Sequence, residues 1–293
     1  MAYIIISDTA CDLPPQLTLE MGVRYQPFNY FINGKKYTNY FDERELKCKD
    51  LFTMLKEDVQ IETKPLEVAQ TKDFFRKFLS KKLDIFCITV SSSLSETFNN
   101  ISIAARELEL EFPERTISVV DSLSTSAGLG LLVYLAARNR DEKMSLRDNV
   151  DYIEIQKNRV RHWVTLNNVS LIGKSNRLDD FGSVGKLFNL KPIIKVNDEG
   201  YLGVISKKMS KAKAVKEIIN DCVENVDDFT GAPTFVAYSG TSPNEANELV
   251  KELKSKYKEL GITSEIYLTR FSPVHSIYLD EDAIGVFNLG DKR

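Results

Sequence analysis

A chain of 293 residues is long enough for two domains, or one large one, with a substantial hydrophobic core. Hydrophobic residues make up 43% and charged residues 28%, which is typical of a globular protein in water. The net charge of −3 provides no overall attraction to nucleic acid or to an anionic membrane, and no run approaches the roughly 18 apolar residues of a membrane span. The N-terminus lacks the basic start and long apolar region of a signal peptide, so we expect a cytoplasmic protein without a transmembrane segment.

In chain order, short apolar runs alternate with helical patterns, which predicts an α/β fold. We expect strands at 3–6, 23–32, 36–39, 84–90, 116–120, 163–168, 190–196, 201–206, 234–238, 264–268 and 284–287. We expect helices at 42–56, 71–81, 93–112, 125–138, 145–159, 215–226 and 242–260, with an S-x-x-D start at Ser145 and a capping box at Ser242 and Glu245. Asn33-Gly34 predicts a turn, and the strands at 190–196 and 201–206 read as a hairpin around 197–200. The segment around Thr63-Lys64-Pro65 reads as irregular. The charged helix near Asp151 could belong to either half, and we place the domains at 1–157 and 158–293.

The stretch from Asp84 to Asn100 carries the most chemistry. An apolar strand ends in Ser91-Ser92-Ser93, and a helical pattern follows. Ser93 and Glu96 fit a capping box, which would make Ser93 the N-cap and place Ser95 at the second helical position. Because a helix start has unpaired N–H groups and partial positive charge, such a turn can hold a carboxylate or a phosphate. The alternative is that these serines only cap the helix.

Three predicted strands end in polar residues. Asp8 follows the first, Ser91–Ser95 follow the strand at 84–90, and Asp121 ends the strand at 116–120. The carboxyl ends of parallel strands lie at one edge of a sheet, where α/β proteins bind ligands. These residues therefore predict a ligand site at that edge.

Other motifs fit known chemistry less well. Gly173-Lys174-Ser175 looks like the end of a P-loop, but Asn168 occupies the position of the first glycine. A hydrolase would need a base for its serine, and His275 is the only plausible partner for Ser95. His162 reads as a packed or surface histidine. The basic run Lys207, Lys208, Lys211 and Lys213 reads as a solvated helix start, or as a docking face for an acidic partner or phosphate.

The cysteines and histidines do not suggest a metal site. Cys11, Cys48, Cys87 and Cys222 lie far apart with no C-x-x-C pair, so we expect reduced, structural thiols. Two histidines and scattered cysteines do not make a common zinc cluster, and we expect no cofactor.

Four segments together resemble the DegV family. The opening I-S-D-T-A-C-D-L-P, with Asp8 and Asp12, is similar to the family's D-S-T-A-D-L-P, and Ser91–Phe98 resembles S-S-x-L-S-G-T-Y. Val119–Val133 is similar to V-I-D-S-x-S-x-S-x-G-L-G-L-L-V, and Asn189–Gly200 resembles N-I-K-P-I-L-x-x-x-x-G. The order and spacing of these segments cover nearly the whole chain.

This resemblance implies two α/β lobes, with a mainly parallel sheet and flanking helices in the first and a ligand cleft between them. It also implies that one long-chain fatty acid, palmitate- or stearate-like, binds there, and that its carboxylate is presented to a partner fatty-acid kinase by a protein that is not itself catalytic. The residues implied at the carboxylate are Ser95, Thr63, Arg177 and His275, with Asp8, Ser93, Thr97, Asn176 and Tyr278 as secondary candidates.

The chain departs from the family pattern at three places near the implied head group. Glu96 replaces the glycine of L-S-G-T, and the loop written T-S-Q-P-S in the family is barely recognisable at Thr63. The family's G-T-H-T-G segment reads Ser276–Asp280, so Tyr278 stands at the usual histidine and His275 lies three residues earlier. These changes leave open a DegV-like enzyme or sensor for another small anion.

Overall fold

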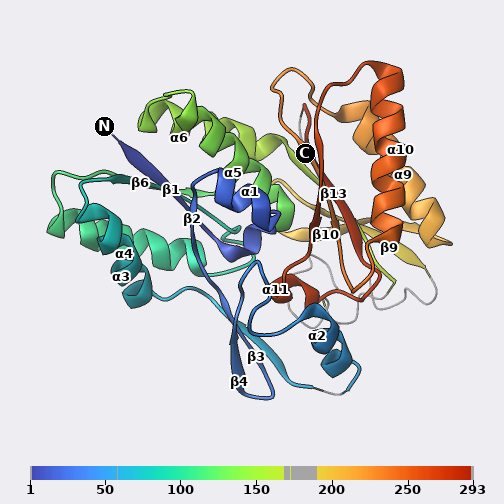
Figure 1. Cartoon of the computed structure of the whole chain (residues 1–293), viewed down its shortest axis with the longest axis horizontal. Helices are drawn as coiled ribbons and strands as arrows, with labels where there is room; N and C mark the ends of the chain where they lie inside the picture. Colours follow the sequence, from blue (N-terminus) through green and yellow to red (C-terminus); the bar gives the residue numbers. More distant parts are fainter. Residues whose placement is uncertain (1, 58, 168–171, 173–189, 292–293) are drawn as a thin grey trace.

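A computed structural model describes residues 2–57, 59–167, 172 and 190–291. Its strands form three sheets, two from the first half of the chain and one from the second (Figure 1). The α/β architecture predicted from the sequence is confirmed. The domain limits 1–157 and 158–293 stay a prediction.

Sheet A is parallel throughout. Its order is β2-β1-β6-β7, with β1 at Tyr3–Asp8, β2 at Arg24–Gln26, β6 at Asp84–Thr89 and β7 at Ile117–Asp121. Every residue of β6 is buried, because helices cover both faces of the sheet. Helices α3 (Val68–Leu79) and α4 (Thr97–Glu111) contact β6 and β7, and α5 (Ser126–Asp141) and α6 (Leu146–Gln156) contact this sheet as well. The predicted ligand edge is the end at which β1, β6 and β7 finish.

Sheet B is a small antiparallel sheet that extends below sheet A in Figure 1. Its order is β4-β3-β5, with β3 at Asn29–Ile32, β4 at Lys35–Thr38 and β5 at Ile61–Lys64. Asn33 and Gly34, both with positive φ, form the tight β3–β4 turn that the sequence predicts. Helix α2 (Cys48–Leu55) lies between β4 and β5 in the chain.

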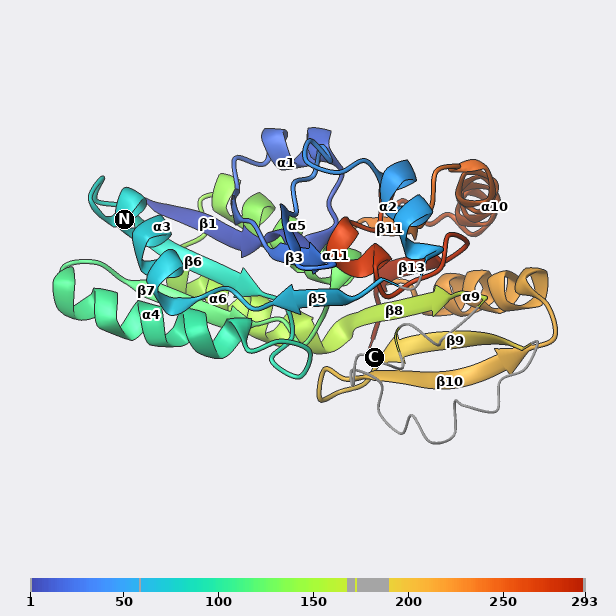
Figure 2. The ribbon, with the colours of Figure 1, turned by 90° about the horizontal axis from the view of Figure 1, so that it is seen from below.

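Sheet C is mixed and belongs to the second half. Its order is β10-β9-β8-β13-β11-β12, with β8 at Val160–Thr165, β9 at Lys191–Val196, β10 at Leu202–Lys208, β11 at Thr234–Tyr238, β12 at Ile266–Arg270 and β13 at Ile284–Leu289. Helices α9 (Lys211–Asn225) and α10 (Asn244–Leu260) pack against it. Figure 2 shows β9 and β10 below β8. The short helices are α1 (Pro15–Glu20), α11 (Pro273–Ser276), η1 (Thr9–Cys11) and η2 (Lys157–Arg159).

Helix α5 joins the two halves. It contacts β1 and β6 of sheet A and β8, β11 and β13 of sheet C, and 12 of its 16 residues are buried. A helix that is enclosed on all sides lacks the polar face of a surface helix, which accounts for its run of Gly, Ala and Leu. Two glycines permit close approach: a Cβ at Gly128 would lie 2.1 Å from Nε2 of His162, and one at Gly130 would lie 2.4 Å from the carbonyl oxygen of Cys11.

Some predicted element boundaries are wrong. Residues 23–32 form two strands in different sheets, because Pro27 cannot donate a ladder hydrogen bond and the chain changes sheets there. The segment read as irregular at Thr63 is strand β5, in which Thr63 pairs with Tyr30.

The predicted capping box at Ser93 is absent. Helix α4 begins at Thr97, after Glu96, whose side chain accepts a bond from Asn99 (Oε2 to Nδ2, 2.9 Å). Ser93 Oγ instead donates to the carbonyl oxygen of Glu199 at 2.6 Å, a contact between residues more than 100 positions apart. A long-range partner therefore replaced the local one.

The box predicted at Ser242 and Glu245 is also absent, since Glu245 pairs with Lys211 and the helix N-cap is Pro243 without a side-chain bond. The Ser145 cap of α6 is confirmed, with Oγ accepting from Asp148 N at 3.2 Å.

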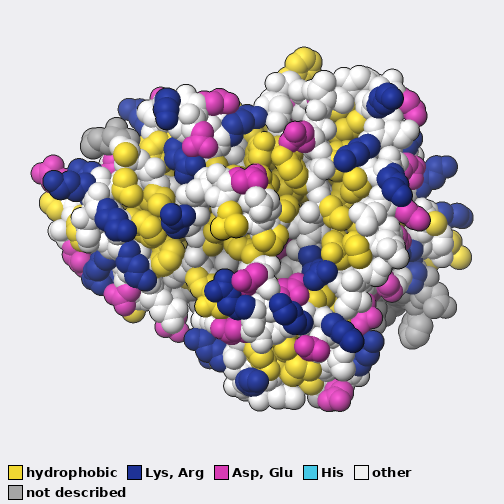
Figure 3. Space-filling view, in the orientation of Figure 1, with side chains coloured by type: hydrophobic (Ala, Val, Ile, Leu, Met, Phe, Trp, Pro, Cys, Tyr) yellow, Lys and Arg dark blue, Asp and Glu magenta, His cyan; other side chains and the backbone are white. Residues whose placement is uncertain are grey.

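The four cysteines are buried and free, which confirms the prediction of reduced thiols. Within the described residues, no helix is both long and apolar enough to cross a bilayer. Basic and acidic side chains intermingle on the face seen in Figure 3.

Candidate ligand cavity

Acidic side chains hold the end of β6 in place. Asp8 Oδ2 accepts from Val90 N at 2.8 Å, and Asp121 Oδ1 accepts from Ser92 N at 3.1 Å. These bonds confirm the prediction that β1, β6 and β7 end at one edge. Asp8 also accepts from Ala10 N at 2.9 Å, so its carboxylate holds two backbone N–H groups in position.

Burial raises the pKa of Asp8 to about 6, against the opposing effect of two backbone N–H donors. Asp12 adds to the rise and His275 opposes it. The turn after β6 therefore depends on a carboxyl group whose charge changes near neutral pH.

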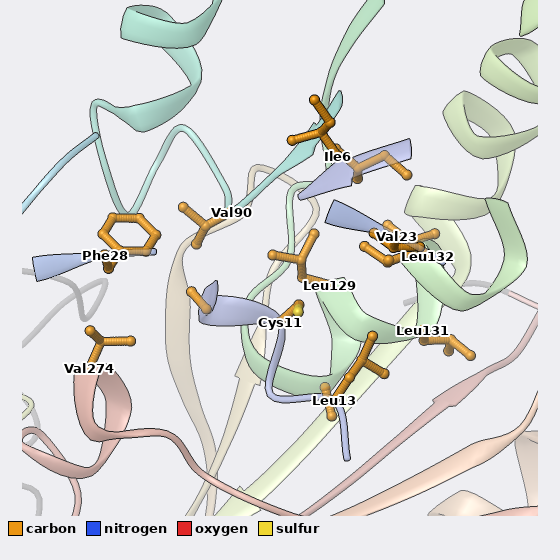
Figure 4. Packing of buried hydrophobic residues seen from close by; sticks show 14 of the residues in the cluster. Ile6, Cys11, Leu13, Val23, Phe28, Val90, Leu129, Leu131, Leu132 and Val274 are labelled. Atoms are coloured by element: carbon orange, nitrogen blue, oxygen red, sulfur yellow. The ribbon is translucent and has the colours of Figure 1, made fainter. Parts of the chain in front are cut away.

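A cavity of about 420 Å³ opens beside this edge. That volume falls within the usual range for small-molecule sites, and most of the wall is apolar. Phe28 from the β2–β3 connection, Val90 after β6 and Val274 of α11 lie on one side of the core in Figure 4. Sheet C closes the other side with Val164, Ile194, Val196, Leu202 and Phe287. The cavity therefore lies between the sheets and is lined by both halves of the chain.

One part of the wall is rich in hydroxyl groups. Thr63 Oγ1 and the Tyr278 hydroxyl lie 2.9 Å apart and link β5 to the segment after α11. Ser95 Oγ lies 2.9 Å from Thr97 Oγ1 and accepts from Thr97 N at 3.3 Å. Thr97 is fully buried, and its hydroxyl oxygen accepts from Leu66 N at 3.1 Å. Thr63, Ser95 and Tyr278 line the cavity and Thr97 supports Ser95 from behind.

A histidine lies on the same wall. His275 Nε2 is 2.9 Å from Thr125 Oγ1, and its Nδ1 is 2.8 Å from Oδ2 of the fully buried Asp12. Asp12 also accepts from Ser126 Oγ at 2.6 Å and, through Oδ1, from Ser272 N at 3.0 Å. This network fixes the orientation of the imidazole ring.

The tip of the β9–β10 hairpin packs against the serine turn, Ser91–Ser95, which follows β6. Ser91 Oγ donates to the Gly200 carbonyl oxygen at 3.0 Å, and Ser93 Oγ bonds to the neighbouring Glu199. Gly200 has φ +89°, and a Cβ there would lie 2.2 Å from Ser91 Oγ. The serines thus join sheet C to sheet A, and Ser93 lines the cavity as well.

Glu96 also lines the cavity and is exposed. The Glu96 side chain bonds to Asn99 and does not form the capping box with Ser93. The negative charge of Glu96 therefore lies at the rim, the solvent-exposed edge of the cavity. It therefore disfavours an anion bound beside Ser95.

Of the residues named from the sequence, Thr63, Ser93, Ser95, His275 and Tyr278 line the cavity. Arg177 and Asn176, and the Gly173-Lys174-Ser175 motif, lie outside the described residues.

Thr125, Ser126, Ser92 and His162 line the cavity without having been assigned a part in it from the sequence. Thr125 falls inside the segment most similar to the family, between two serines, but nothing in its spacing relative to His275 indicates that they meet. His162 is buried as the packed reading expects; its ring lines the cavity and packs closely against Gly128.

The fold and the cavity define a class: an α/β protein that encloses a mainly apolar ligand site between two sheets, with hydroxyl groups and a histidine on one wall. A family model described as "Uncharacterised protein, DegV family" matches residues 3–290, and the chain belongs to the DegV family.

Other proteins are similar to this chain over nearly its whole length, both in sequence and in structure. A DegV domain-containing protein of Clostridium perfringens is 25% identical over 292 residues, covering 99% of this chain and 98% of its own. A fatty-acid-binding DegV family protein from Thermus thermophilus superposes with a TM-score of 0.84 at 20% identity, covering 99% and 100% of the two chains. A stearic-acid-binding protein from Eubacterium ventriosum also gives 0.84 at 20% identity, covering 98% of each chain. At these identities the superpositions show the shared fold.

Proposed function

We propose that the protein binds one long-chain fatty acid in the cavity, with its carboxylate at the hydroxyl groups and its tail among the apolar residues. The observation that carries this proposal is the division of a single cavity into two parts. Thr63, Ser95 and Tyr278 offer hydroxyl donors at one part of the wall, and Val164, Ile194 and Phe287 offer apolar surface elsewhere. An amphipathic chain with one anionic end matches this division.

The serine turn suits a carboxylate for a physical reason. Ser95 lies two residues before the first residue of α4, a helix of 15 residues whose N-terminus carries partial positive charge. A hydroxyl hydrogen bond to a charged group is stronger than one to a neutral group. Relatives with the same fold are fatty-acid-binding proteins, which supports the same cargo here.

By the family resemblance, the bound carboxylate is presented to a partner fatty-acid kinase, and the protein is the non-catalytic partner in that transfer. Arg177, in the place of the family arginine, is proposed as a further carboxylate ligand. Adding a fatty-acid kinase and ATP to the loaded protein should then yield an acyl phosphate, trapped with hydroxylamine.

Native mass spectrometry tests the cargo. The protein purified from cells should carry a mass matching one fatty acid, and adding palmitate to stripped protein should raise its melting temperature by mass action. An empty protein that no fatty acid stabilises would contradict the proposal. The alternative, a different small anion as ligand, then gains support from Glu96 and Tyr278, which depart from the family pattern.

Ser95→Ala tests the placement of the head group. Losing a hydrogen bond to a charged group costs about 1.5–3 kcal/mol, so palmitate affinity should fall roughly 10- to 100-fold. Ser255→Ala, on the exposed side of α10, is the control and should leave affinity unchanged. An unchanged affinity in Ser95→Ala would place the carboxylate elsewhere.

A further inference from the structure

Asp12, His275 and Thr125 form a line of three side chains that ends on the cavity wall. The distances are 2.8 Å from Asp12 Oδ2 to His275 Nδ1 and 2.9 Å from His275 Nε2 to Thr125 Oγ1. Each link is within the range expected between a nucleophile, its base and the group that orients the base. The sequence offered His275 as the only plausible base for Ser95, whereas the fold brings the Thr125 hydroxyl to His275.

The first member of the line is held firmly. The Asp12 side chain is 0% exposed and accepts bonds from Ser126 Oγ and Ser272 N in addition to facing His275. A buried carboxylate on Nδ1 keeps the proton on that nitrogen, so Nε2 is left as the acceptor for the Thr125 hydroxyl. This is the tautomer that a general base requires.

The hydroxyl is also well placed for attack. Thr125 and His275 both line the cavity that would take an acyl chain. Thr125 directly precedes α5, whose 16 residues direct partial positive charge to this end, where a tetrahedral oxyanion would form. Leu123, two residues before Thr125, and Ser126, directly after it, have φ values of +48° and +52°. Such strained backbone persists where surrounding hydrogen bonds hold it in place. Here the hydrogen bond from Ser126 Oγ to Asp12 holds the chain next to Thr125.

We propose that this cavity hydrolyses activated acyl groups, namely acyl thioesters or esters, through Thr125 as nucleophile and His275 as base. Thr125 Oγ attacks the carbonyl carbon while its proton passes to His275 Nε2. The imidazolium then gives this proton to the departing sulfur or oxygen as the bond to the carbonyl breaks, leaving the acyl group on Thr125. Water, activated by His275 in the same way, releases a free fatty acid and restores Thr125.

For long-chain substrates this inference rests on the proposed function, because the acyl chain must enter the same cavity. The product would be the proposed cargo itself. The activity would thus let the protein load from an activated acyl donor as well as from free fatty acid.

Hydrolysis of p-nitrophenyl butyrate is the test, because this short ester needs little of the cavity, and palmitoyl thioester follows as the long substrate. Thr125→Val, nearly the same shape without the hydroxyl, should lower the rate at least roughly 100-fold. Thr125→Ser should retain activity, and His275→Gln should lose it.

Intact mass after rapid quenching should show one acyl group on the wild type and none on Thr125→Val. Ser255→Ala should match the wild type throughout. Equal rates for the wild type and Thr125→Val, or no release above buffer, would overturn the inference. Because palmitate binding is measured separately, a protein that binds the acid but does not cleave the ester disproves only the hydrolysis.

Discussion

Gly128 of α5 and His162 of β8 are packed so closely that an added Cβ on the glycine would lie 2.1 Å from Nε2 of the ring. Helix α5 can therefore approach sheet C only because this position has no side chain. His162 lines the cavity, so the approach of helix α5 to sheet C also affects the cavity wall.

Gly128→Ala should destabilise the protein by about 1–3 kcal/mol, although alanine is the better helix former. The reason is that the buried His162 ring must move, and the cavity is the space beside it. Urea unfolding measures the loss, and palmitate affinity should fall with it. The double variant Gly128→Ala/His162→Ala should lose less unfolding free energy than the two single variants lose when their losses are added. A more stable Gly128→Ala protein would contradict the close packing.

Gly200→Ala and Gly203→Ala form a matched pair on the β9–β10 hairpin. A Cβ at Gly200 would meet Ser91 Oγ at 2.2 Å in a backbone with φ +89°, whereas one at Gly203 would meet nothing within 4 Å. We expect the first change to cost about 1–3 kcal/mol and the second to be nearly neutral. Thermal unfolding of both variants decides this, and equal melting temperatures would show that the hairpin tip does not need to contact the serine turn.

Glu96→Gln should raise palmitate affinity a few-fold. Removing a carboxylate near the bound anion removes a repulsion of about 1 kcal/mol for an exposed pair. The gain should shrink as salt concentration rises, because salt screens exposed charges. Isothermal titration at two salt concentrations gives the comparison, with the exposed Glu109→Gln at the far end of α4 as control. The same affinity in Glu96→Gln and Glu109→Gln would place the carboxylate away from the rim.

The charge of Asp8 should make stability depend on pH. Its pKa of about 6 in the fold exceeds the 3.8 of an exposed aspartate, so folded protein binds the proton more tightly than unfolded protein. The contribution is complete below pH 3.8 and is lost as pH rises through 6, by at most about 3 kcal/mol.

The free energy of urea unfolding, wild type minus Asp8→Asn, should therefore decrease between pH 4 and pH 7.5. His275 and Asp12 act on the same carboxyl group and contribute to the profile. A difference that is constant with pH, or that increases, would mean that Asp8 is ionised throughout the range.

The sequence alone determined the order of most elements, because apolar periodicity and turn residues are local properties. The buried strand β6, the β9–β10 hairpin and the Ser145 cap followed from neighbouring residues, and the meeting of β1, β6 and β7 at one edge followed from parallel pairing. Thr63 could be named as a cavity residue only by resemblance to a family, whereas Ser95 also followed from the polar turn after the strand at 84–90.

Tertiary structure decided which groups meet. Ser93 could cap its own helix or bond to Glu199, and the approach of sheet C favoured the distant partner. His275 meets Thr125 and Asp12 across 150 and 263 residues of chain, a contact that no spacing records. Local patterns fix which backbone conformations are favourable. The packing of α5 between two sheets fixes which side chains lie within hydrogen-bonding distance, and therefore what the cavity can do.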